Sequence, residues 1–134
     1  MTLEHVAILT DQLERLKDYY ILYFGGTPNQ KYTNPTTGLE TYFITFESGA
    51  KLEIMHLPKL AENKNDIAIP NKGITHIAFG MDTMPEVEEK AKQLETGGFR
   101  IVRGPRKTGD GYYEFETLDP DGNRIEVLTK YVNS

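Results

Sequence analysis

The chain has 134 residues, a length typical of one domain, and its 20 Asp and Glu outnumber its 15 Lys and Arg to give a net charge of −5. Nucleic-acid backbones require a basic surface, so we expect no nucleic-acid partner. The absence of cysteine excludes disulfides and thiolate chemistry, and it leaves His, Asp and Glu as the strong metal ligands.

The first half of the chain predicts a strand, a helix and further strands. The strand covers residues 3–9, and the helix begins at Thr10 or Asp11 with an apolar stripe formed by Leu13, Leu16, Tyr20 and Tyr23. Gly25-Gly26 follows the helix, and a short strand is expected after it. Two more strands are predicted, over residues 40–47 and 51–56.

The second half repeats this order. A strand is expected over residues 74–80, and Thr83 and Glu86 form the capping box of a helix that ends at Gly97 in the left-handed conformation. The apolar stripe of this helix is Val87, Ala91 and Leu94. A short strand after Gly97-Gly98 and strands over residues 112–118 and 124–129 complete the half.

The two halves are also similar in sequence. Residues 3–8 (LEHVAI) match residues 74–79 (ITHIAF), and residues 51–55 (KLEIM) match residues 124–128 (RIEVL) at nearly the same offset. We therefore predict a single domain, residues 1–134, that consists of module 1 (1–56), a linker (57–73) and module 2 (74–134).

Four polar residues occupy equivalent places in the two copies. Alternate residues of a strand share a face, which puts His5, Glu53, His76 and Glu126 opposite the aliphatic residues of their own strands. One histidine or glutamate on a wet sheet face would mean little, but the pair occurs twice. We therefore predict that all four side chains bind one divalent metal ion, Zn, Ni, Co, Mn or Fe.

Other polar residues are candidates for contact with a substrate. Tyr113, on the strand before the Glu126 strand, is one of them. Arg106 and Lys107 belong to a basic segment that we expect to be a solvated loop, or alternatively an anchor for a substrate carboxylate. His56 has no counterpart in the second copy and is expected at the surface or next to the metal ligands.

Five segments together resemble the vicinal oxygen chelate superfamily, which includes glyoxalase I, bleomycin resistance proteins and dioxygenases. They are LEHVAIL, KLEIM, GITHIAF, PRKTGDGYYEF and LDPDGNRIEVL. The resemblance implies an α+β fold in which two tandem βαβββ modules form incomplete β-barrels around a metal-binding cleft. The ligands of the family fall on His5, Glu53, His76 and Glu126.

The order His, Glu, His, Glu is similar to that of bacterial lactoylglutathione lyase. This resemblance implies a metal-dependent lyase or isomerase that converts a hemithioacetal or related 2-hydroxycarbonyl compound through a metal-bound enediolate. Glu126 is then the first choice of catalytic base, with Glu53 as the alternative or as the partner that returns the proton. The arginine that glyoxalases often carry on the first strand is absent, because Ile8 and Leu9 stand there, so the resemblance does not extend to glutathione.

Other functions of the same superfamily remain open. They are epimerisation beside a thioester, transfer to an epoxide as in fosfomycin resistance, ring cleavage by a dioxygenase, and metal-free sequestration of a ligand, which would not need the four ligand residues. We expect a small-molecule substrate and a homodimer, with each site built within one chain or across two. The opening residues resemble no signal peptide and no segment is apolar enough to span a bilayer, so a cytoplasmic protein without a membrane partner is expected.

Overall fold

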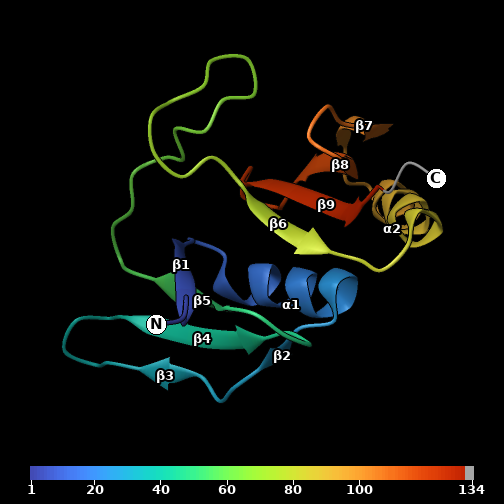
Figure 1. Ribbon diagram of the computed structural model, residues 1–134. Helices are drawn as coiled ribbons and strands as arrows, with labels where there is room; N and C mark the ends of the chain where they lie inside the picture. Colours follow the sequence, from blue (N-terminus) through green and yellow to red (C-terminus); the bar gives the residue numbers. More distant parts are fainter. Residues whose placement is uncertain (132–134) are drawn as a thin grey trace. The chain divides into compact units, whose positions relative to one another are not determined.

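The computed structural model describes residues 1–131 of the chain. The chain divides into two compact units, Met1–Glu62 and Asn63–Ser134, and each contains one helix and one open sheet (Figure 1). Within the described residues, neither helix has the length and apolar content needed to cross a membrane.

The first unit has one helix and five strands. In chain order they are β1 (His5–Leu9), α1 (Leu13–Phe24), β2 (Thr27–Pro28), β3 (Tyr32–Thr33), β4 (Glu40–Thr45) and β5 (Lys51–His56). The strands follow the order β1-β5-β4-β2, and β3 also pairs with β4. Strands β1 and β5 are parallel, and the other pairs are antiparallel. In place of the one short strand predicted after Gly25-Gly26 there are two, β2 and β3, and both pair with β4.

The second unit has the same topology. Its elements are β6 (Ile77–Gly80), α2 (Met84–Thr96), β7 (Ile101–Lys107), β8 (Tyr112–Leu118) and β9 (Arg124–Lys130), with the strand order β6-β9-β8-β7. Strand β6 is parallel to β9, as β1 is to β5. The predicted α+β class with tandem βαβββ modules is therefore confirmed. The prediction of a loop around Arg106 was wrong, because this segment pairs with β8 as strand β7.

Each helix packs its apolar stripe on the aliphatic face of its own sheet. The buried helix residues are Leu13, Leu16, Tyr19 and Tyr20 in α1 and Val87, Ala91 and Leu94 in α2. The sheets contribute Ile44, Leu52 and Ile54 in the first unit and Phe115, Ile125 and Val127 in the second, all at most 3% exposed. Because strand residues alternate between faces, this packing leaves the opposite face of each sheet to the polar residues. We call this opposite face the front face.

The helix ends agree with the sequence in one case and differ in two. The capping box of Thr83 and Glu86 is present at the start of α2. The first helix is capped by Gln12, without a side-chain hydrogen bond, because Thr10 still pairs with β5 through a 2.8 Å hydrogen bond from its amide to the carbonyl of Met55. Gly97 keeps helical dihedrals (φ −75°), and Gly98, one residue later, has the positive φ of 90°.

Candidate functional site

The front face of the first unit carries the first histidine–glutamate pair. His5 begins β1, and its Nε2 lies 3.7 Å from Oε1 of Glu53 on β5. The parallel register pairs Ala7 with Glu53, which puts His5 two residues earlier on the same face. The Glu53 side chain is 14% exposed and the His5 side chain 40% exposed, so solvent reaches the pair from the imidazole side.

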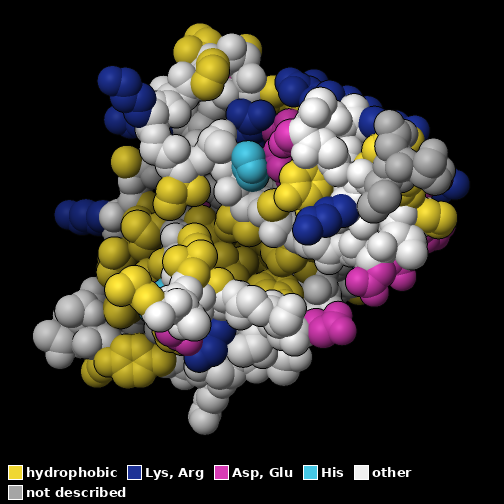
Figure 2. Space-filling view, viewed as in Figure 1, with side chains coloured by type: hydrophobic (Ala, Val, Ile, Leu, Met, Phe, Trp, Pro, Cys, Tyr) yellow, Lys and Arg dark blue, Asp and Glu magenta, His cyan; other side chains and the backbone are white. Residues whose placement is uncertain are grey.

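The second unit repeats this pair. Nε2 of His76 lies 3.2 Å from Oε2 of Glu126 on β9. Ala78 pairs with Glu126, so His76 again precedes the paired residue by two positions, although β6 begins only at Ile77. Figure 2 shows histidine and acidic side chains beside one another at the surface.

Within each unit, the predicted histidine and glutamate therefore lie together on the face opposite the helix. In both pairs, Nε2 is the ring nitrogen that faces the carboxylate. Neither unit, over residues 1–131, gathers three or more His, Asp or Glu side chains close enough to hold a metal ion. One unit by itself thus offers two ligands, fewer than the four of a tetrahedral metal site.

Three further side chains orient the first pair. Nδ1 of His5 lies 3.0 Å from Oε1 of Glu4, and the hydrogen bonds of His5 and Lys51 lower the pKa of the Glu4 carboxyl. The Thr41 hydroxyl donates to Oε2 of Glu53 at 3.1 Å. The Phe43 ring packs at right angles to the His5 ring, with 5.3 Å between the centroids. These contacts hold the imidazole and the carboxylate on the sides that do not face the other member of the pair.

Charged residues surround the second pair. Burial, and then the adjoining Glu126 carboxylate, raise the pKa of the Glu114 carboxyl on β8. Glu116, which pairs with Glu126 across the strands, is buried and forms a close ion pair with Arg124. The front face of the second unit is therefore a charged surface, whereas the first unit presents Phe43 beside its pair.

A bulge in β7 adds two arginines to this charged surface. Arg103 pairs with Glu116 and Arg106 pairs with Glu114, with register shifts on both sides of Arg103. Residues three apart on a regular strand point to opposite faces, so the bulge is what puts both arginines on the front face. Gly104 permits it, because its φ is +82° and a Cβ there would lie 2.5 Å from the carbonyl oxygen of Glu114.

Apart from Arg106, the other candidate residues lie away from the two histidine–glutamate pairs. The Tyr113 hydroxyl donates to Oε1 of Glu88 on α2 at 2.6 Å, which puts this tyrosine on the helix side of the sheet. Lys107 pairs with Tyr113 in the register, and its Nζ donates to the Tyr131 hydroxyl at 2.7 Å. Neither placement supports a substrate contact. His56 ends β5, and its Nδ1 lies 3.0 Å from the carbonyl oxygen of Thr10.

Residues 2–127 match the Glyoxalase/Bleomycin resistance protein/Dioxygenase superfamily. The chain belongs to this superfamily. The match covers both units and all four members of the histidine–glutamate pairs. Among curated proteins, the uncharacterized protein YqjT of Bacillus subtilis (strain 168) is 30% identical over 59 residues, which are 42% of this chain and 46% of YqjT. The aligned part thus spans about half the length of that relative.

Solved structures of the superfamily share the fold. The trypanothione-dependent glyoxalase I of Leishmania major superposes with a TM-score of 0.77 at 22% identity, covering 96% of this chain and 86% of that one. A glyoxalase family protein of Bacillus cereus gives a TM-score of 0.83 at 12% identity, covering 98% of this chain and 95% of that one. At these identities the likeness concerns the fold alone.

The sequence did not predict Thr41 and Glu114, which lie beside the two histidine–glutamate pairs. Thr41 on β4 pairs with Met55, and Glu114 on β8 pairs with Leu128, so the two residues hold equivalent places beside Glu53 and Glu126. The strand alternation around each residue predicts its face, but a residue of β4 or β8 finds its neighbour only through the antiparallel register. Their equivalence is hidden because one is a neutral hydroxyl and the other a carboxyl.

Proposed function

We propose that this protein is a metal-dependent lyase or isomerase of the glyoxalase I type. Its substrate would be a hemithioacetal or a related 2-hydroxycarbonyl compound. The observation that carries the proposal is the repeated pair, in which Nε2 of a histidine faces a glutamate carboxylate at the same place on the front face of each unit. A purely structural duplication would require the aliphatic face to recur, but it would not require these polar side chains.

The donor set fits a divalent cation. Two neutral imidazoles and the two carboxylates of Glu53 and Glu126 balance a charge of +2 and suit Zn, Ni, Co, Mn or Fe. Histidine ligands commonly donate their second ring nitrogen to a carboxylate, which fixes the tautomer and leaves the other nitrogen to bind metal. The contact between His5 Nδ1 and Glu4 leaves Nε2 as the ligand nitrogen in this way. We propose that His5, Glu53, His76 and Glu126 hold one ion, within one chain or across the two chains of a homodimer.

When bound, the cation supplies Lewis acidity to a substrate that carries two neighbouring oxygens. The chain supplies the proton transfers. In our proposal the Glu126 carboxylate takes the carbon-bound proton, and this same proton then returns to the neighbouring carbon, either from Glu126 or by way of the Glu53 carboxylate. Glu53 keeps its orientation through the Thr41 hydroxyl, and Arg103 and Arg106 lie on the same face as Glu126. Arg106 is therefore the residue that we propose for contact with the substrate oxygens next to Glu126.

Metal content is the first test. Purified protein is expected to contain about one transition-metal ion for each set of four ligands, measured by elemental analysis. The double variant His5→Gln/His76→Gln should lose the metal, whereas His56→Gln, outside the two pairs, should keep it. Wild-type protein that takes up no metal from a panel of the five ions would contradict the proposal and would favour a metal-free binding protein.

Turnover is the second test. An absorbance assay with methylglyoxal and a panel of thiols detects the product thioester. Glu126→Gln should reduce kcat by at least about 100-fold, as expected for loss of a general base, and should retain part of the metal. Glu47→Gln changes an exposed glutamate outside the site and serves as the matched control. Full activity of Glu126→Gln would refute the assigned role, and inactivity of the metal-loaded wild type with every thiol would refute the glyoxalase reaction.

A further inference from the structure

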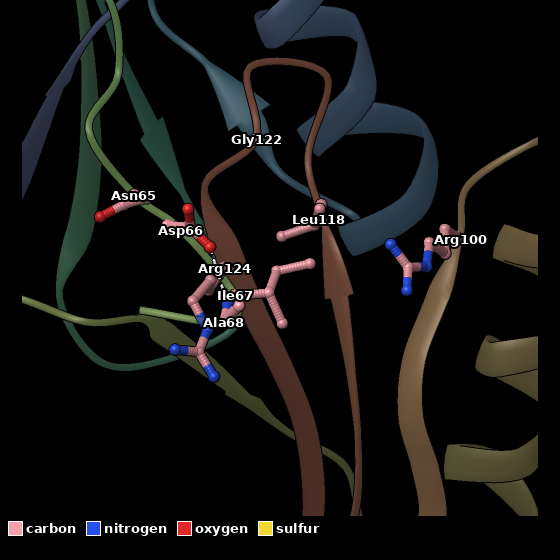
Figure 3. A pocket seen from close by; sticks show the side chains of 8 residues that line it. All are labelled: Asn65, Asp66, Ile67, Ala68, Arg100, Leu118, Gly122 and Arg124. Atoms are coloured by element: carbon pink, nitrogen blue, oxygen red, sulfur yellow. Dashed lines mark hydrogen bonds between the residues drawn. The ribbon is translucent and has the colours of Figure 1, made fainter. Parts of the chain in front are cut away.

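A pocket of about 490 Å³ lies wholly within the second unit (Figure 3). Its volume is within the range of small-molecule sites. Arg100, Leu118 and Arg124 come from three neighbouring chain segments of the sheet. The turn between β8 and β9 contributes Gly122. The segment that precedes β6 contributes Asn65, Asp66, Ile67 and Ala68.

The pocket is on the front face, next to Glu126. Leu118 pairs with Arg124 across β8 and β9, and Arg124 precedes Glu126 by two positions on the same face. Two residues of a strand span about 7 Å, so the pocket begins one side chain away from the second histidine–glutamate pair. Figure 3 shows Arg100 and Arg124 on the two sides of Leu118.

Hydrogen bonds hold the walls of the pocket. The side-chain nitrogen of Asn63 donates to the carbonyl oxygen of Asp121 at 3.2 Å and to Oδ1 of Asn123 at 3.1 Å. This joins the segment 63–68 to the turn that closes β8 and β9. Asp119 holds the same turn by accepting from the backbone amides of Asp121 and Asn123, both at 2.9 Å. The segment thus has a fixed attachment beside the sheet.

Of the two arginines that line the pocket, one forms an ion pair and the other does not, within residues 1–131. Arg124 is already paired with the buried Glu116. Oδ1 of Asp66 accepts from the backbone amide of Ala68 at 2.8 Å. Arg100 is exposed, and within residues 1–131 no carboxylate lies within ion-pair distance of its guanidinium. Leu118, Ile67 and Ala68 place apolar surface next to this free guanidinium.

We propose that this pocket binds the anionic end of the substrate, a carboxylate on a short aliphatic stem. The Arg100 guanidinium binds the carboxylate, since its planar fork matches the two oxygens. The stem lies along Leu118 and Ile67, where it displaces water from apolar surface. Calling the ligand the substrate rests on the proposed function, because only the adjacency to Glu126 connects the pocket with the reaction.

An NMR titration of uniformly ¹⁵N-labelled, metal-free protein tests the pocket directly. The probes are sodium butyrate, inorganic phosphate and butylammonium chloride at equal ionic strength. Butyrate should shift the backbone amides of Ala68, Leu118 and Gly122 in a saturable way, and butylammonium should not. Inorganic phosphate should bind less tightly than butyrate, because it has no stem; tighter phosphate binding would replace the carboxylate with a phosphate ligand and overturn the proposal.

Two variants complete the test. Arg100→Gln should weaken butyrate binding by about 10-fold, the usual effect of losing one charge-assisted pair, while Arg15→Gln, on the exposed side of α1, should leave it unchanged. Equal affinity in Arg100→Gln and wild type, or shifts centred on residues outside the pocket, would overturn the assignment. Because no metal and no turnover are involved, this outcome is independent of the metal and activity tests. If the wild type bound butyrate but failed both the metal-uptake and the turnover tests, the pocket would still be an anion site. Only its link to catalysis would be refuted.

Discussion

Thr41 and Glu53 are joined across β4 and β5 by a hydrogen bond of 3.1 Å from the threonine hydroxyl to Oε2 of the carboxylate. Thr41 is 5% exposed, so few water molecules can replace it as a donor. The other oxygen of the carboxylate, Oε1, faces His5. Thr41 is therefore a positioning residue that turns one particular oxygen of Glu53 toward the imidazole.

The first prediction concerns Thr41→Val, which keeps the shape of the side chain and removes the donor. If Glu53 is a metal ligand, metal affinity should fall by about 10-fold, the lower end of the effect of removing such an outer contact. Competition with a chelating dye measures this affinity. Thr41→Ser should restore it, and Thr45→Val, an exposed position four residues along β4, should leave it unchanged. Equal metal affinity in Thr41→Val and wild type would show that the hydrogen bond has no positioning role.

The second prediction concerns Glu14 on α1. Hydrogen bonds from Lys17, Lys31 and Tyr42 lower the pKa of its carboxyl from 4.5 to about 2. A lowered pKa stabilises the fold above the unfolded value, and this contribution is lost as the pH falls from 4.5 toward 2. The Glu14 side chain is 53% exposed, so solvent screening reduces the gain, and Glu14→Gln should lower the free energy of unfolding by only about 1 kcal/mol at pH 7.

Urea unfolding at several pH values checks this. The difference between wild type and Glu14→Gln should be constant above pH 4.5 and should disappear near pH 2. Tyr42→Phe should remove part of the same contribution, whereas Tyr32→Phe, on an exposed ring, should not. A difference between wild type and Glu14→Gln that persisted at the acid end would mean that the packing of the side chain, and not its charge, is responsible.

The third prediction concerns the ion pair of Glu116 and Arg124. The two side chains are 7% and 16% exposed. Glu116→Gln leaves the guanidinium with little water and no carboxylate, and we expect a loss of about 3 kcal/mol in the free energy of unfolding. Glu40→Gln breaks a more exposed pair with Lys31 and should cost less than about 1 kcal/mol.

A double-mutant cycle separates the pair from its surroundings. Glu116→Gln/Arg124→Gln should be less destabilised than the sum of the single variants, by at least about 1 kcal/mol. Additive single changes would show that the two side chains act independently in spite of their contact.

The fourth prediction concerns the capping box of α2. The Thr83 hydroxyl accepts from the amide of Glu86, and the Glu86 carboxylate accepts from the amide of Thr83 at 2.9 Å. Thr83→Ala should therefore cost about 1 kcal/mol in the free energy of unfolding, measured by urea denaturation. Thr83→Ser retains the oxygen and should recover most of this stability. A serine variant as unstable as the alanine variant would assign the effect to the lost methyl group.

Local features of the sequence determined the pattern of the fold and the two halves of the candidate site. Alternation along β5 and β9 predicted that Glu53 and Glu126 oppose the buried aliphatic residues, and the structure confirms that each shares a face with the histidine of its own unit. The duplication gave an independent check, because the same alternation had to hold twice. The capping box was equally readable, since its two residues are three positions apart and interact within one turn.

Only the tertiary structure decided which side chains surround these pairs. The bulge at Gly104 brings Arg103 and Arg106 to one face, although their spacing predicts opposite faces. The placement of Tyr113 against α2, and the pocket beside Arg100, depend in the same way on segments that are distant in the chain. The physical reason is that a strand's period is a local property of the backbone, whereas register, bulges and cross-strand partners are set by which pairing buries the most apolar surface and satisfies the most backbone hydrogen bonds.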